Sequence, residues 1–203
     1  ALYFTTGSNN VAVGNGSQFN TRAADDNTSV GDQSLSSNTT GAGNTAIGSG
    51  SLTANTTGTR NTAVGYNSLD ANTTSSDNTA VGYNALTAAN GADQCTAIGQ
   101  GALALTTTGD NNTGVGFAAL NANQTGSQNS ALGAYAADSV TTGSNITAIG
   151  YLAAQAVTTG GRITAVGTAA VDAATTANDL TGLGYQALTS NTYDRRQRLL
   201  LRV

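Results

Sequence analysis

One pattern of small, aliphatic and glycine residues recurs along the chain with a strict 17-residue period. The string "NTAVGYNSL" at residues 61–69 returns as "NTAVGYNAL" at residues 78–86. In each copy a small residue and then an aliphatic residue precede a glycine, and in ten of the eleven copies a Leu, Ala or Val follows that glycine four positions later. The motif glycine recurs without an insertion or deletion as Gly14, Gly31, Gly48, Gly65, Gly82, Gly99, Gly116, Gly133, Gly150, Gly167 and Gly184.

The repeated unit predicts short strands and tight turns. The segment Thr-Ala-Val-Gly combines strand-forming residues with a glycine suited to a turn. The Ala-Leu pair that follows predicts a second short strand, with Asn- and Gly-rich turns between the two. Because this period is too short for a helix-pair repeat, we expect an all-β parallel β-solenoid. This β-roll would contain eleven coils over residues 1–188.

Stacking of identical coils predicts which residues form the core. Val64 before the motif glycine and Leu69 after it recur in neighbouring coils as Val81 and Leu86, and all four are expected inside. Thr62 lies two residues from Val64 and therefore on the same face of the strand, so we expect it to be partly buried. Backbone groups would pair between coils about 4.8 Å apart, which gives a rod on the order of 50 Å long.

The small residues predict that several chains associate. Two buried aliphatic side chains per coil recover only part of the backbone entropy lost on ordering, so a single thin roll is marginally stable. Small residues occupy the slot two before the motif glycine and the slot three after it in every copy. We expect flat faces of small residues to let rolls pack side by side as a homo-oligomer, in the first place a trimer.

These motifs resemble two kinds of known repeat. The segments 44–48, 61–65 and 78–82 are similar to the head repeats of trimeric autotransporter adhesins, and "NTAVGYNAL" followed by "TTG" resembles repeats of phage tail-fibre-like proteins. The resemblance covers residues 8–188. It implies a left-handed β-roll trimer, a location on a cell surface or virion, and a role in adhesion. The adhesin repeat is shorter than the repeat of this chain, so the cross-section of the coil is expected to differ.

The composition excludes several classes of function. Charged residues make up 9% of the chain, and Lys, Glu and His are absent. Without His or Lys as a general base we expect no enzyme, no catalytic residue and no cofactor. A net charge of −4 disfavours nucleic acid as a partner, and no apolar run approaches the ~20 residues of a membrane span. Since the chain begins with Ala1, we expect it to be processed or part of a longer protein.

Three features of the sequence are candidates for chemistry, and for each of them we also consider a purely structural role. The motif glycines recur once per coil, which indicates turns and not a phosphate loop. Cys95 stands where most copies have Asn, and we favour a tolerated substitution over a reactive thiol. Six Asp residues share one turn of the coil, where a solvated edge is favoured over a calcium ladder; they are Asp25, Asp26, Asp77, Asp93, Asp110 and Asp179.

The Asn slot predicts an inward ladder whose side chains bond neighbouring amides or cap turns. It consists of Asn10, Asn27, Asn44, Asn61, Asn78, Asn112 and Asn129, with Cys95 interrupting it. Ile146, Ile163 and Leu180 take the slot in the last three copies. We therefore expect the interior to become dry toward the C-terminal end.

Aromatic and threonine ladders are the candidate ligand sites. Aromatic residues follow several motif glycines, where they would stack against sugars or, as we favour, pack against a sister chain; they are Tyr66, Tyr83, Phe117, Tyr151 and Tyr185. Regular Thr arrays on flat β-solenoids can bind ice. The expected partial burial of the Thr column argues against ice binding here.

The pattern ends at residue 189, and residues 189–203 form a separate segment. Its string "RRQRLLLRV" predicts either a structural end, as a capping strand or the start of a stalk helix, or a docking segment. Acidic coils of another chain would attract such a docking segment and so build a filament. The basic residues of the string are Arg195, Arg196, Arg198 and Arg202. We expect a structural or adhesive shaft of an extracellular fibre, with a host-surface or glycan receptor. The alternative is a solenoid that binds glycan or ice through its Tyr or Thr ladder.

Overall fold

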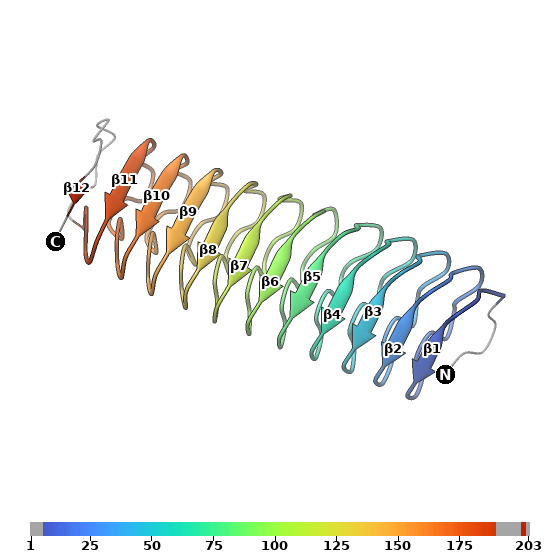
Figure 1. Ribbon diagram of the computed structural model, residues 1–203. Coiled ribbons are helices and arrows are strands. Elements are labelled where there is room, and N and C mark those ends of the chain that lie inside the picture. The colour runs from blue at the N-terminus through green and yellow to red at the C-terminus, as the bar shows by residue number, and fades with distance from the viewer. Residues whose placement is uncertain (1–5, 190–199, 202–203) are drawn as a thin grey trace.

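The computed structural model describes residues 6–189 and 200–201 and shows a parallel β-solenoid. Each coil contributes one short strand, and all strands lie side by side in one sheet along the rod (Figure 1). The part of the chain described contains no helix and therefore none that could span a membrane. The strands are β1 (Val11–Val13), β2 (Thr28–Val30), β3 (Thr45–Ile47), β4 (Thr62–Val64), β5 (Thr79–Val81), β6 (Thr96–Ile98), β7 (Thr113–Val115), β8 (Ser130–Leu132), β9 (Ile146–Ile149), β10 (Ile163–Val166), β11 (Leu180–Leu183) and β12 (Leu200–Leu201).

The register of the sheet follows the sequence period from β1 to β11. Thr45 pairs with Thr62 and Thr62 with Thr79, so each residue lies beside its equivalent in the next coil. The backbone ladder continues outside the strands, as in the bond of 3.0 Å from the Leu52 N–H to the Ser68 carbonyl. The expected solenoid with a 17-residue coil is therefore confirmed. At the end of the sheet, β12 adds a parallel strand beside β11.

The motif glycines lie in close contact with the backbone of the next coil. Each takes a φ between 112 and 141 degrees, a region that L-residues with side chains rarely adopt. A Cβ on Gly65 would lie 2.4 Å from the carbonyl oxygen of Gly82 in the next coil. A side chain is therefore excluded both by the backbone conformation and by the neighbouring coil.

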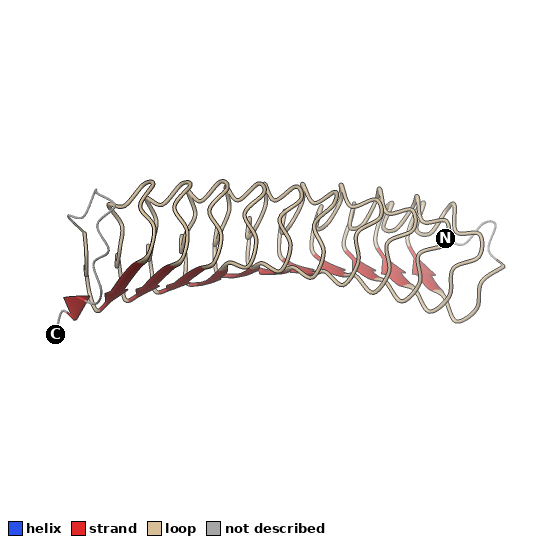
Figure 2. Cartoon of the chain, turned by 90° about the horizontal axis from the view of Figure 1, so that it is seen from above, coloured by secondary structure: helices blue, strands red, loops and turns tan. Residues whose placement is uncertain are grey.

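The expected second strand is not formed. The Ala-Leu segment makes turns instead, and the Leu residues adopt a left-handed conformation, with φ of 52 degrees at Leu69 and Leu86. The prediction failed because the chain must reverse its direction more than once within each short coil. Figure 2 shows the result, with strands along one face of a gently bowed rod and turns along the rest of its outline.

Two columns of large side chains fill the narrow interior. Leu35, Leu52, Leu69, Leu86 and Leu103 are fully buried, as expected. The Asn column is also fully buried from Asn27 onward. It is replaced in the late coils by buried Ile146, Ile163 and Leu180, so the expected inward direction of this slot is confirmed.

The late coils also exchange volume between the two sides of the interior. Where Ile146 replaces an Asn of the ladder, the Leu slot of the same coil holds Ala154. In the preceding coil that slot already holds the buried Ala137. A larger side chain on the strand side is thus matched by a smaller one on the turn side, as close packing requires.

The aliphatic residues before the motif glycine point outward, so their assignment to the core was wrong. Val64 and Val81 are half-buried, and Ile47 and Ile98 are each 40% exposed. The small residues point inward instead, with Ala46 and Ala63 fully buried. The small-residue columns are therefore not outer faces on which chains pack, and this argument for a trimer fails.

Candidate functional surface

The outward side of the strands presents the most regular surface of the molecule. Two columns run along it, one mainly of Thr and one of Val, Ile or Leu, and neither contains a charged residue. We call this surface the Thr-aliphatic face. It comprises Thr28, Thr45, Thr62, Thr79, Thr96, Thr113, Ser130, Thr147, Thr164 and Thr181, beside Val30, Ile47, Val64, Val81, Ile98, Val115, Leu132, Ile149, Val166 and Leu183.

The residues of this face range from half-buried to exposed. Thr62 and Thr79 are half-buried, Thr113 and Ser130 are exposed, and Leu132 is 52% exposed. The Thr and aliphatic residues share a face, as the alternation predicts, but the face is the outer one. The expectation that the Thr column lies partly inside the roll, which argued against ice binding, was therefore based on the wrong side of the strand.

Ser130 interrupts the regularity of the face at one place. It lacks the methyl group that a Thr would place there, and a shallow apolar depression lies at this position. The depression is lined by Thr113, Val115, Ser130, Ala131, Leu132 and Ile149. It is too open to enclose a small molecule, so we treat it as part of the face and not as a separate pocket.

The aromatic ladder lies beyond the motif glycines, next to this face. The rings of Tyr66 and Tyr83 stack with centroids 5.6 Å apart and an angle of 10 degrees between their planes. Each ring therefore covers one face of the other and leaves only one open for a sugar. This geometry favours packing over a continuous sugar platform, although both tyrosines are 51% exposed.

A second aromatic group contains a residue that the sequence pattern did not reveal. Tyr135 lies one position later in its coil than the other aromatic residues, where Ala134 takes the aromatic slot. Its ring meets Phe117 edge to face at 5.1 Å and Tyr151 at 6.4 Å. A search that allowed a shift of one position in the period could have identified Tyr135.

Tyr185, the last residue of the aromatic ladder, is 64% exposed near the end of the rod.

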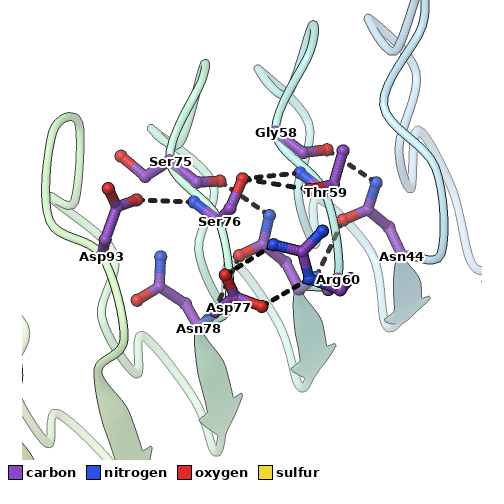
Figure 3. Close-up of polar contacts among 10 residues, drawn as sticks. Asn44, Gly58, Thr59, Arg60, Ser75, Ser76, Asp77, Asn78 and Asp93 are labelled. Atoms are coloured by element: carbon purple, nitrogen blue, oxygen red, sulfur yellow. Dashed lines mark hydrogen bonds and ion pairs between the residues drawn. The ribbon is translucent and has the colours of Figure 1, made fainter.

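One turn column uses its side chains to accept backbone N–H groups from the preceding coil (Figure 3). The Asp93 carboxylate accepts the Ser76 N–H at 2.7 Å, and the Ser76 hydroxyl accepts the Thr59 N–H at 3.0 Å. Asp110 accepts the N–H of Asp93 at 2.8 Å in the same way. This shared task explains why both Asp and Ser occur in this column.

The adjacent turn column forms ion pairs between coils. Arg60 donates two bonds to the Asp77 carboxylate, at 2.6 and 2.7 Å (Figure 3). The hydrogen bond from Arg60 lowers the pKa of the Asp77 carboxyl. Arg162 and Asp179 repeat the arrangement at 2.6 and 2.9 Å. Within the described ranges no three acidic or Cys side chains lie close enough to hold a metal ion.

Cys95 is buried inside the Asn ladder. Its N–H donates to the Asn78 side-chain oxygen at 2.9 Å, and its thiol donates to the Gly109 carbonyl at 3.3 Å. Burial raises the pKa of the thiol to about 11. A thiol that is buried and stays protonated is a poor nucleophile. The expected docking residues Arg195, Arg196, Arg198 and Arg202 lie outside the described residues.

Comparisons with models of protein families, with curated proteins and with solved structures found no match to this chain. The fold and the surface define a class of protein, a β-solenoid repeat protein with an uncharged Thr-aliphatic face.

Proposed function

We propose that the chain is the rigid shaft of an extracellular fibre. The unbroken register carries this proposal, because from β1 to β11 each coil pairs with the next residue for residue. Such a ladder resists bending at any one coil and extends by about 4.8 Å with each repeat. Length and stiffness are what a fibre shaft needs, and the resemblance to adhesin and tail-fibre repeats supports this choice.

Association of several chains is part of the proposal. A homo-oligomer, with a trimer first, rests on the resemblance alone once the small residues are placed inside the roll. End-to-end stacking into a filament and binding of a host-surface or glycan receptor belong to the same proposal. The location that fits them is a cell surface or a virion.

Electron microscopy of the native particle tests the shaft. With an antibody against the repeats, we expect label on rods that project from the surface of the cell or virion that makes the protein. Label confined to the cell interior would contradict the proposal. Light scattering of the purified chain at micromolar concentration tests association, and a folded monomer there would remove the oligomer and filament from it.

The alternative of a ligand-binding solenoid is favoured by one observation, the outward direction of the Thr column. Glycan binding by the Tyr ladder is not favoured, because the rings of Tyr66 and Tyr83 cover each other.

A further inference from the structure

The threonines of the Thr-aliphatic face differ from the other threonines of the coil. In a closing turn, Thr39, Thr56 and Thr141 donate their hydroxyls to a carbonyl of the next coil at 2.9, 3.0 and 3.2 Å. Across the described residues, the hydroxyls of the Thr-aliphatic face have no hydrogen-bond partner within the chain. Their partners must come from water or from another molecule.

The partner must suit hydroxyl and methyl groups in a repeating grid. Along the rod the groups repeat about every 4.8 Å, and across the strand the Thr and aliphatic columns lie about 6.6 Å apart. The grid carries no charge, and it includes the shallow depression at Ser130. A folded peptide or a branched glycan presents varied groups to a surface, whereas a crystal lattice presents the same group many times in two directions.

We propose that the Thr-aliphatic face binds ice. Apolar surface restricts the orientation of first-shell water, so the Val, Ile and Thr methyl groups hold water in cages over the sheet. The unpartnered Thr hydroxyls hydrogen-bond those waters and fix their positions in the grid. A layer of water ordered in two directions by a stiff sheet can join the surface of an ice crystal.

A second copy of the chain is the competing occupant, because an exposed aliphatic column also suits a protein interface. Such an interface would set part of the Thr hydroxyls against the aliphatic column of the other copy, which offers no hydrogen-bond partner. Each hydroxyl left unpaired there would lose the hydrogen bond that it makes to water outside the interface. Water satisfies the same hydroxyls fully, so the observations favour ice.

The inference goes beyond the shaft and does not depend on it, since a free rod would carry the same face. In a fibre, the face would attach its bearer to ice. The experiment therefore measures ice binding and association state in the same samples.

Thermal hysteresis and inhibition of ice recrystallisation are measured on the full chain and two variants. Thr79→Tyr combined with Thr96→Tyr places two bulky rings in the middle of the face. Thr74→Tyr is the matched control, because Thr74 is exposed at a closing turn. We expect activity in the wild type and the control and its loss in the double variant, with unchanged circular dichroism in all three. Activity that survives in the double variant overturns the inference.

Light scattering separates failure of this inference from failure of the shaft. A folded monomer without thermal hysteresis overturns ice binding, and the proposal of a fibre shaft is then tested by electron microscopy alone. A stable oligomer that the double variant dissociates and the control does not overturns ice binding and places a second copy on the face. Ser130→Thr completes the Thr column, and we expect it to retain or increase hysteresis; a loss would count against the grid.

Discussion

At the scale of the residue, burial overrides the backbone preference of Leu. Leu69 and its equivalents hold a left-handed conformation that costs roughly 1–2 kcal/mol in a residue with a Cβ. Full burial of a Leu side chain returns about 1.5–3 kcal/mol. The strain is therefore offset at each coil, and the turn places the Leu side chain against the strand from the opposite wall.

Cys95 should make stability depend on pH in the alkaline range. Its pKa is raised from 9.0 to about 11 by burial, so between these values the unfolded chain loses the thiol proton while the folded chain keeps it. The contribution of the protonated thiol is complete below pH 9, and it is lost as pH rises toward 11. We expect the free energy of unfolding to fall by about 1.4 kcal/mol per pH unit in this window.

Denaturant unfolding between pH 8 and 11 measures this effect. Cys95→Ser is the control, because a serine hydroxyl can occupy the same site without titrating in the range. Subtraction of its profile removes the contribution of the exposed tyrosines. Equal pH profiles in the two proteins would show that the thiol is not buried as described.

At the scale of the element, the columns between coils behave as separate ladders. In one of them Asn55 donates to the Asn38 side-chain oxygen at 3.0 Å, and Asn72 donates to that of Asn55 at 2.9 Å. The next coil has Ala89 in this place, and the Asn72 side-chain oxygen is buried without a partner. A ladder that ends inside the rod thus leaves one acceptor unsatisfied.

Ala89→Asn should extend this ladder and stabilise the protein. The new amide can donate to Asn72, and its oxygen lies one coil from the hydroxyl of the buried Thr106. We expect a gain of about 0.5–1.5 kcal/mol in the free energy of unfolding, the usual net value of one hydrogen bond. Ala88→Asn at a half-buried outward position serves as control. Chemical denaturation measures both, and an equal or smaller gain at Ala89 would contradict the ladder.

At the scale of the whole molecule, the rod is a sum of equivalent coils, each in contact with its neighbours. Deletion of residues 65–81 joins Val64 directly to Gly82 and restores the motif. We expect a folded rod that is shorter by about 4.8 Å, because one whole coil is removed. Deletion of residues 66–81 removes one residue fewer and shifts the register.

Circular dichroism, thermal unfolding and small-angle scattering compare the two deletions. The first should retain the β spectrum and a melting temperature near that of the wild type, as expected for repeats with nearest-neighbour contacts. The second should lose structure around the junction, since inward and outward residues exchange places. Equal behaviour of the two deletions would contradict the strict 17-residue coil.

The period in the sequence determined the architecture. A strictly spaced repeat without insertions gives the number of coils, their parallel pairing and the register of Thr62 with Thr79. It also places Leu69 and Asn61 inside, because each lies in a column that is the same in most coils. Local alternation puts Thr62 and Val64 on one side of the strand and Asn61 and Ala63 on the other.

Only the tertiary structure decided which of these two sides faces water. Hydrophobicity favours Val inside, but the interior is too narrow for it opposite the Leu wall. At Gly114, which takes the Ala slot, a Cβ would already lie 3.3 Å from the Leu103 Cγ and 3.0 Å from the Ala119 carbonyl oxygen. A slot of this depth admits Ala, Ser or Gly, so the larger aliphatic residues lie outside beside the threonines. The distance between the two walls of a coil is a property of the closed turn, and no pattern along one strand contains it.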